Sequence, residues 1–250
     1  MNNRHLVASV DGMVAQLVNL ISKGYRYYFV GLVADREAQL IRDERMLGYY
    51  EAQLPKWTRE RRKGRGLANF RYLRYEEWFI VLATEGQAPT FWNEDRQRIR
   101  DVRNAPIRFK GYSISYRQGG WKDRRKWSDP AIRERDMKRH VRVQLDGETF
   151  NGVKAYFLNI ATHRQADFLA REFAELSFQP YRPVREQLFQ ILRAVNRARG
   201  NAGYQRVPAA VIRFKRHIVR AFAESCVQPG MLSNYLPDDP QPTSSRLTTV

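Results

Sequence analysis

Residues 56–86 read KWTRERRKGRGLANFRYLRYEEWFIVLATEG, and this stretch gives the strongest indication of the fold. It begins with a dense basic run, Lys56 to Arg65, continues through alternating Arg and Tyr, and ends in the apolar run Trp78 to Ala83. An uninterrupted apolar run of this kind, rich in aromatic and β-branched residues, predicts a strand at the centre of a sheet. We therefore expect a sheet whose neighbouring segment is basic and aromatic.

Two more strands are predicted next to this central one. Tyr25 to Val33 reads YRYYFVGLV, which is nearly free of charge and predicts a strand buried on both faces. Phe70 to Tyr75 predicts a strand that leads directly into 78–84. Since Glu76 and Glu77 are poor residues for a hairpin turn, the two segments form either a hairpin or one bent strand.

Helices are predicted around these strands by apolar residues that recur at intervals of three and four. Residues 4–23 are expected to form an amphipathic helix that ends at Gly24. Residues 36–62 are expected to form two helices divided at Pro55, because a proline ring opposes a continuous helix. Their apolar stripe consists of Leu40, Ile41, Met46, Leu47, Tyr50 and Leu54.

The second half of the chain is predicted to add short strands and then helices. Strands are expected at 107–109, 112–117 and 140–145. Gly111 is placed at a bulge and Asp146-Gly147 at a turn, while residues 150–160 fit a strand or a helix equally well. Helices are expected at 164–176, 183–199 and 208–223.

These elements predict an α+β protein with an N-terminal helix, a mixed or mainly antiparallel sheet of about four to six strands, and a C-terminal helical layer. Residues 1–160 are expected to form a basic nucleic-acid-binding domain with a charged loop or insertion at 118–139. Residues 161–227 form the helical layer, packed on the same domain. Residues 233–250 are rich in Pro, Ser and Thr and are expected to be a disordered tail.

The chain carries 44 Lys and Arg residues against 26 Asp and Glu residues, which gives a net charge of +18. Most of this excess lies at 56–142, where 24 basic residues face 11 acidic ones. Self-repulsion of this size opposes folding, and nucleic acid is the commonest polyanionic partner of such a protein. The alternatives are an acidic protein, an anionic membrane surface, and a codon bias towards Arg, which outnumbers Lys 35 to 9.

Other features narrow the class of protein. Cys226 is the only cysteine, so neither an intramolecular disulfide nor a cysteine-based zinc site is expected. Asp11 and Gly12 interrupt the apolar residues near the N-terminus, and no run approaches the roughly 18 apolar residues of a membrane span. We therefore expect a cytoplasmic protein that has no membrane partner.

Three parts of the chain are candidates for phosphate contact. The first is the basic run of Lys56, Arg59, Arg61, Arg62, Lys63 and Arg65. The second, in the charged insertion, consists of Lys122, Arg124, Arg125 and Lys126. The third is the helix at 183–199, where Arg193 and Arg197 share a face. This helix and the one at 208–223 are too far apart in sequence for a helix-turn-helix, and two antiparallel helices fit better. The alternative for each part is a solvated basic surface.

The strand at 70–75 supplies aromatic candidates for base contact. By strand parity, Phe70, Tyr72 and Arg74 share one face. Aromatic rings flanked by Arg on a sheet are one way in which proteins hold single-stranded nucleic acid, and the alternative is that the rings fill the core. We predict a protein that binds DNA or RNA, in replication or in a mobile element. The residues that would contact bases or nearby phosphates are Arg71, Tyr72, Arg74, Tyr75 and Tyr112.

An enzyme is the main alternative, as a metal-dependent nuclease, a strand transferase or a replication initiator. Tyr112 would be a candidate nucleophile. The four histidines form no closely spaced pair, which counts against a zinc site and against paired-histidine endonucleases. No cofactor is predicted unless this alternative holds, in which case Mg²⁺ is required. A third alternative is a structural component of an RNA–protein or acidic-protein assembly. The carboxylates available to a Mg²⁺ site are Glu76, Glu77, Asp95 and Asp101.

Overall fold

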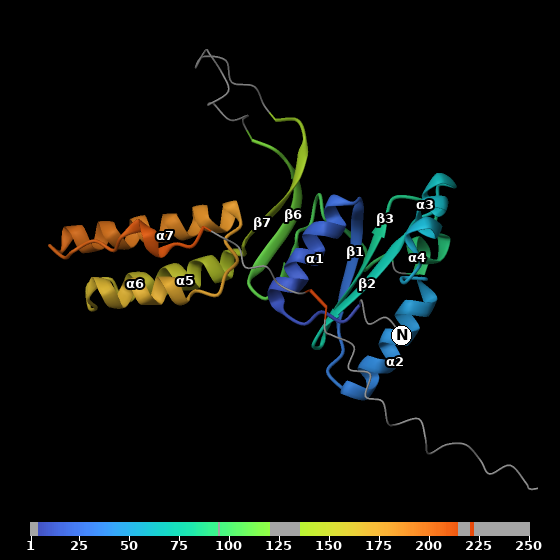
Figure 1. Ribbon diagram of the computed structural model, residues 1–250, viewed down its shortest axis with the longest axis horizontal. Helices are drawn as coiled ribbons and strands as arrows, with labels where there is room; N and C mark the ends of the chain where they lie inside the picture. The colour runs from blue at the N-terminus through green and yellow to red at the C-terminus, as the bar shows by residue number, and fades with distance from the viewer. Residues whose placement is uncertain (1–4, 95, 121–135, 215–220, 223–250) are drawn as a thin grey trace, which may run out of the picture.

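The apolar run at 78–83 forms the centre of an antiparallel sheet, as its sequence predicts (Figure 1). The computed structural model describes residues 5–94, 96–120, 136–214 and 221–222. β3 (Trp78–Thr84) lies between β1 (Tyr25–Leu32) and β2 (Phe70–Tyr75), and the short β4 (Arg100–Asp101) pairs with the outer side of β1. The five inner residues of β3 are all buried.

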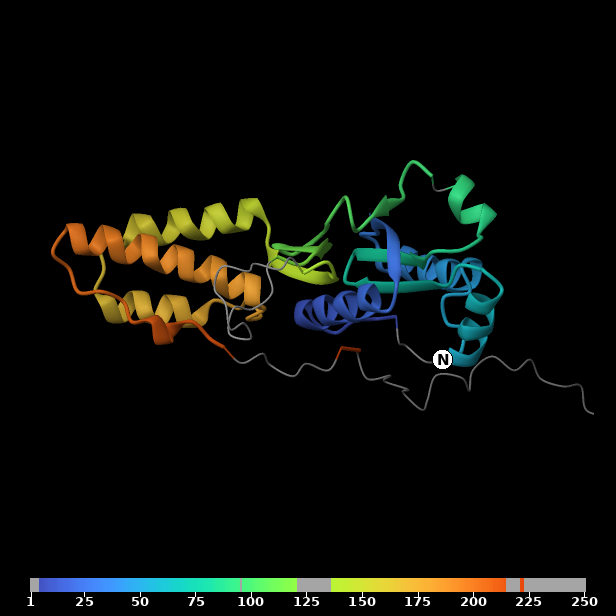
Figure 2. The ribbon, with the colours of Figure 1, turned by 90° about the horizontal axis from the view of Figure 1, so that it is seen from above.

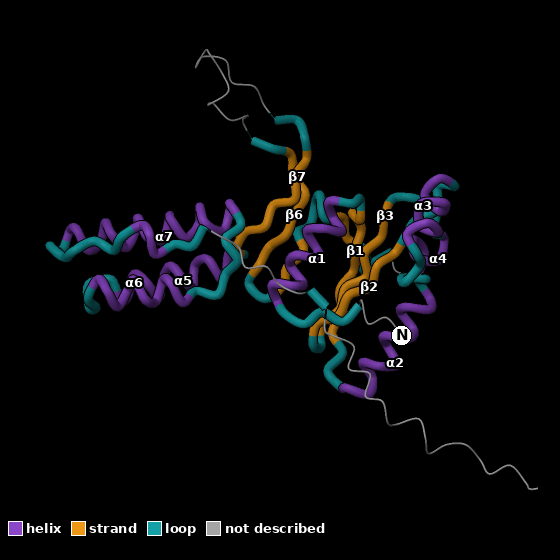
Figure 3. The backbone as a smooth tube through the Cα atoms, in the orientation of Figure 1, coloured by secondary structure: helices purple, strands orange, loops and turns teal. Residues whose placement is uncertain are grey.

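A second antiparallel sheet follows in the chain. β6 (Tyr112–Gln118) lies between β5 (Ile107–Phe109) and β7 (Arg139–Leu145). The strands occupy the middle of the molecule, and helices gather at both ends of it (Figure 3). The α+β class is thus confirmed, although over the described residues the strands are divided between a four-stranded and a three-stranded sheet.

Helices of the first half of the chain surround the first sheet. They are α1 (Val10–Ser22), α2 (Arg36–Tyr49), α3 (Lys56–Gly64) and α4 (Pro89–Glu94). The predicted division of α2 from α3 at Pro55 is confirmed. α1 begins later than predicted, because the Ser9 side chain caps it by accepting a hydrogen bond from the Gly12 N–H (3.1 Å). Residues 5–7 run along β2 instead, and the Val7 N–H donates to the Arg74 carbonyl (2.8 Å).

Only part of the predicted apolar stripe of α2 faces the sheet. Leu40 and Ile41 are 60% and 64% exposed, so their predicted place in the core is wrong. Met46 and Tyr50 of the same stripe are buried as predicted, and Asp43, which is not part of the stripe, is buried with them. The side chain of Asp43 pairs with Arg74 of β2, and this ion pair fixes which side of α2 faces the sheet.

A bundle of three helices follows β7 at one end of the molecule (Figure 1). It consists of α5 (Gly147–Ile160), α6 (Ala166–Glu175) and α7 (Arg182–Asn201). α5 resolves the ambiguity at 150–160 in favour of a helix. The Asp146 side chain accepts a hydrogen bond from the Thr149 N–H (2.8 Å). Asp146 is therefore the N-cap of α5, and the turn predicted there is wrong.

The chain after α7 departs from the sequence prediction. The helix expected at 208–223 is wrong over the described residues, where only a short 3₁₀ helix, Ala209–Val211, forms. Residues 215–220 and 223–250 lie outside the described part, and so does the predicted tail at 233–250. Over the described residues, α7 therefore has no following helix with which to form a helix-turn-helix.

Two tight turns settle points that the sequence left open or placed wrongly. β2 and β3 form a hairpin in which Glu76 adopts a positive φ of 51°. Lys110 and Gly111 have φ of 42° and 82°, and they join β5 to β6. Two successive positive φ angles are typical of a hairpin turn, so the bulge predicted at Gly111 is wrong.

β1 is less buried than its sequence predicts. β4 pairs only with Tyr27 and Tyr28 of β1. Beyond that point the outer edge of β1 is open, and Val30 and Leu32 are 36% and 73% exposed. The burial expected on both faces therefore holds for only part of this strand.

Two hydrophobic cores lie on opposite faces of the first sheet. The smaller core packs Phe29 and Phe79 of the sheet against Met46 of α2 and Phe91 of α4. The larger core joins the other face to α1, the second sheet and helices α5–α7 (Figure 2). Among the described helices, none has the length and apolar character needed to span a membrane.

Candidate nucleic-acid interface

α3 carries the basic run that the sequence singles out. It starts directly after Pro55, and its short length leaves most of its side chains at the surface. Arg62 has a structural role, since it pairs with Glu51 and donates to the Ala68 carbonyl (3.3 Å). The exposed cations of this region, none of which forms an ion pair with a described residue, are Lys56, Arg61, Lys63 and Arg65.

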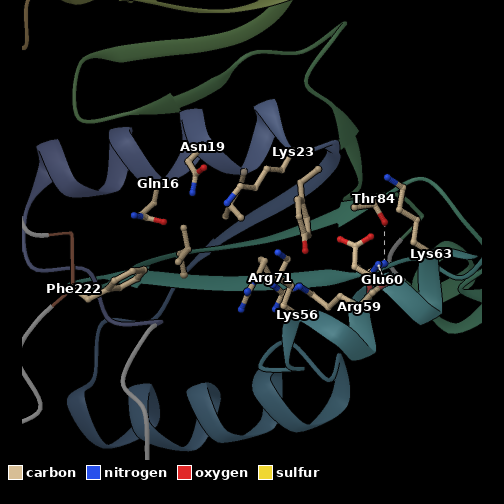
Figure 4. Close-up of a pocket in the computed structure, with 14 residues that line it drawn as sticks. Gln16, Asn19, Lys23, Lys56, Arg59, Glu60, Lys63, Arg71, Thr84 and Phe222 are labelled. Carbon is tan, nitrogen blue, oxygen red and sulfur yellow. Dashed lines mark hydrogen bonds between the residues drawn. The ribbon is translucent and has the colours of Figure 1, made fainter.

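α3 forms one wall of a cleft of about 720 Å³, and α1 forms the opposite wall (Figure 4). β2 supplies the floor through Arg71 and Leu73, and Asn69 before β2 and Thr84 at the end of β3 complete it. Asn69 lies just before β2, and its side-chain Nδ2 donates to the Arg59 carbonyl of α3 (3.0 Å). This hydrogen bond ties the floor of the cleft to its wall.

Cations from three elements converge on this cleft. Of the described residues that line it, only Glu60 is acidic. Arg59 donates to the Leu54 carbonyl, and Arg71 donates to the Ala52 carbonyl (3.2 Å), so backbone oxygens hold both guanidinium groups in place. The cations that line the cleft are Lys23, Lys56, Arg59, Lys63 and Arg71.

The wall formed by α1 was not anticipated from the sequence. Gln16, Asn19 and Lys23 line the cleft at intervals of three and four residues. They form a polar stripe beside the buried apolar face of α1, which includes Leu17 and Leu20. That spacing was visible in the sequence, but nothing in it indicates that this stripe faces α3, which begins more than thirty residues later.

Most of the aromatic candidates for base stacking lie in the interior. Tyr72 and Tyr112 are each 2% exposed. The Tyr112 hydroxyl accepts a hydrogen bond from the Gln179 N–H (2.8 Å), and burial raises the pKa of Tyr112 to about 12. Tyr75 is partly buried and packs edge-on against Phe109, with ring centroids 5.8 Å apart. These rings therefore pack in or against the core in this structure, and they do not form an exposed stacking surface.

Arg74 is held by a buried carboxylate. Its Nε and Nη2 donate to Asp43 at 2.8 Å each, and the Tyr72 hydroxyl donates to the same side chain (2.5 Å). His5 Nε2 lies 3.4 Å from Asp43 Oδ2. Burial alone would raise the pKa of Asp43, but the hydrogen bonds from His5, Arg74 and Tyr72 outweigh it and hold that pKa below its usual value. The guanidinium group of Arg74 is thus already paired with the Asp43 carboxylate of α2.

The carboxylates proposed for a Mg²⁺ site are not brought together. Asp101 pairs with Arg103 beside Tyr27 of β1. Glu77 lies at the other end of this strand, where its carbonyl accepts from the Val33 N–H. Six residues of strand, roughly 20 Å, separate the two positions.

The other acidic candidates do not complete such a site. Glu76 pairs with Lys110 (3.4 Å). Asp95 lies outside the described residues. Over the part of the chain that is described, no group of three or more His, Cys, Asp or Glu side chains is arranged to hold a metal ion.

The remaining basic candidates lie away from the cleft or outside the described part of the chain. Arg193 and Arg197 are exposed on α7, at the opposite end of the molecule from α3 (Figure 1). They cannot form one continuous surface with the cleft. The residues of the second basic block, which all lie outside the described residues, are Lys122, Arg124, Arg125 and Lys126.

No protein-family model matches this chain, and a search of curated proteins found no match either. The function is therefore argued from the chain's own residues.

Proposed function

We propose that the protein binds nucleic acid and that α3 and the cleft beside it hold the phosphates. The observation that supports this most strongly is the gathering of five cations and one acidic residue around a single cleft. Lys23, Arg59 and Arg71 come from three different elements, so the cluster is not simply one basic stretch of sequence.

The gathering of these charges opposes folding, even though Arg59 and Arg71 also donate to backbone carbonyls. Like charges that are close together repel, and a protein relieves this repulsion with an acidic side chain, with salt or with an anionic ligand. The five cations and one carboxylate of the described lining leave a formal charge of +4 (5 − 1). A nucleic-acid backbone supplies one negative charge per nucleotide, and it would release condensed counterions on binding. The net charge of +18 favours the same partner.

A binding titration with single-stranded DNA, duplex DNA and RNA at about 50 mM and 200 mM salt tests this proposal. We expect measurable affinity for at least one of them, and a steep loss of affinity as salt rises. Neutralising several phosphates gives a logarithmic salt slope of about −0.7 to −0.9 per contact. An absence of binding to all three at low salt would show that the proposal is wrong.

The variant Arg61→Glu with Lys63→Glu tests the assignment to α3. We expect weaker binding and a salt slope that is shallower by about 2, because two phosphate contacts are lost. The matched control is Arg193→Glu with Arg197→Glu, which makes the same charge change on α7. If the control weakens binding as much as the α3 variant does, the phosphates do not depend on α3 in particular.

A further inference from the structure

We infer that the cleft between α1 and α3 accommodates unpaired nucleotides, so that the protein prefers a single strand to a duplex. This inference rests on the proposed function and names the form of nucleic acid that the cleft takes. It follows from the size of the cleft, from the different chemistry of its two walls, and from an amide at its floor.

The size of the cleft suits one or two nucleotides. Its volume of about 720 Å³ falls within the roughly 300–1,000 Å³ of sites that bind small molecules and cofactors. A duplex keeps its bases stacked inside and presents its phosphates outside, so it would touch only the rim between the two helices. An unpaired nucleotide can enter the cleft with its base and leave its phosphate at the rim.

The two walls carry different chemical groups. Lys56, Arg59 and Lys63 project from α3, whereas Gln16 and Asn19 project from α1 on the other side (Figure 4). A nucleotide has the same asymmetry, with an anionic phosphate at one end and a base edge that both donates and accepts hydrogen bonds at the other. Amide side chains also donate and accept, which is why Asn and Gln pair with base edges.

Between the walls, the cleft has apolar groups suited to a base. Leu20, Tyr25 and Leu73 all contribute to its lining. An aromatic base that lies on this surface leaves water without losing hydrogen bonds at its flat face. Three cations on α3, two amides on α1 and apolar groups beside them match the groups of a nucleotide, while Lys23 adds a cation at the end of α1 and Arg71 adds one at the floor.

Asn69 at the floor has an unused hydrogen-bonding atom. This residue is 5% exposed, and its Nδ2 donates to the Arg59 carbonyl. Its Oδ1 is buried and accepts no hydrogen bond from any described residue. Buried polar atoms are almost always paired, so this acceptor would be satisfied if a ligand that reaches the floor of the cleft supplied an N–H or O–H group. A base amino group or a ribose hydroxyl is such a donor.

The test compares two charge-reversal variants of the full chain in fluorescence anisotropy with a labelled 12-nucleotide single strand and the matching duplex. Lys56→Glu with Lys63→Glu changes cations that line the cleft. Arg61→Glu with Arg65→Glu makes the same charge change outside it and is the control. We expect the cleft variant to lose about tenfold more single-strand affinity than the control, and both to lose similar duplex affinity. Equal losses of single-strand affinity would overturn the inference.

A charge-neutral variant separates the cleft from general attraction. Gln16→Ala with Asn19→Ala removes both amides of α1 and leaves the charge unchanged. We expect single-strand affinity to fall about threefold to tenfold with the salt slope intact, while Ser22→Ala, which does not line the cleft, behaves as wild type. An unchanged affinity in the double variant would contradict the inference.

Competition distinguishes the possible ligands. Excess unlabelled single strand should displace the probe far better than adenosine monophosphate or poly-glutamate at equal charge concentration. Displacement by the mononucleotide at a similar concentration would mean that the ligand is a free nucleotide, and displacement by poly-glutamate would mean an acidic protein. If single strand and duplex both bind but no cleft variant differs from its control, this inference fails and the proposed function stands.

Discussion

At the scale of single residues, the carboxylate of Asp43 explains an orientation that the sequence could not predict. The alternation at 70–75 correctly predicts that Tyr72 and Arg74 share a face, since both contact Asp43. Alternation does not say what covers that face, however, and the partner lies 29 residues before Tyr72. A charged residue on α2 is expected at the surface by default. Its burial makes sense only once Arg74 is seen opposite it.

Asp43→Asn should lower the free energy of unfolding by about 3 kcal/mol at pH 7, because it leaves the buried Arg74 without a counter-charge. The folded-state pKa of Asp43 lies below its unfolded value, so its stabilisation is present at neutral pH and is lost as pH falls through the folded pKa, below about pH 4. Urea denaturation at several pH values should therefore show the difference from wild type shrinking in acid. Glu44→Gln, an exposed neighbour on α2, is the control and should have little effect.

At the scale of elements, the sequence predicts that a helix or strand forms better than it predicts where that element ends and which other elements it contacts. The strands at 25–33, 70–75 and 78–84 carry apolar or alternating patterns, and all three form. The predicted ends of elements are wrong where a side chain has two possible roles. Asp146 is suited to a turn and equally to a helix N-cap, and only the presence of α5 after it shows that it is the N-cap. α7 continues two residues past its predicted end at Arg199, through Gly200 and Asn201.

Arg199 joins the ends of two helices. It is 2% exposed, and it donates to the carbonyls of Ala161 and Arg164 after α5 and to the carbonyl of Gln205. Arg199→Met should cost about 2–4 kcal/mol in urea denaturation, because buried carbonyls lose a charged donor. Arg197→Met changes an exposed arginine on the same helix and should stay within about 0.5 kcal/mol of wild type. Similar losses in both variants would mean that Arg199 does not act through these hydrogen bonds.

At the scale of the whole molecule, the candidate site shows where sequence reasoning ends. The cations of α3 are adjacent in sequence and were predicted together. Arg71 of β2 was also predicted as a contact residue. The cleft further needs Gln16 and Asn19 of α1 and Lys23 at the C-cap of α1, which only the packing of α1 beside the sheet brings near. Local periodicity identifies an amphipathic helix, but it does not say which element its polar side faces. The wall of the cleft formed by α1 could therefore not be predicted before the fold was known.

The same packing links the bundle of α5–α7 to the sheets. The larger core contains Leu17 of α1, Ile114 of β6 and Val195 of α7, so one continuous core joins the first sheet to the bundle. A hydrogen-bonded chain crosses this junction: the Gln179 N–H donates to the Tyr112 hydroxyl, and Gln179 Nε2 donates to Asp11 of α1 (2.6 Å). A shared core predicts that the bundle and the sheets unfold together.

Tyr112→Phe tests this coupling, because it removes the hydroxyl that accepts the hydrogen bond of the buried Gln179 N–H. We expect a loss of about 1–3 kcal/mol in the free energy of unfolding, with far-UV circular dichroism and tryptophan fluorescence still following one transition. The two probes report on different parts of the molecule, since the described tryptophans, Trp57, Trp78 and Trp92, all lie with the first sheet and its helices, whereas α5–α7 supply much of the helical signal. Separate transitions in the wild-type protein would mean that the bundle is an independent domain, and that the shared core does not couple it to the sheets.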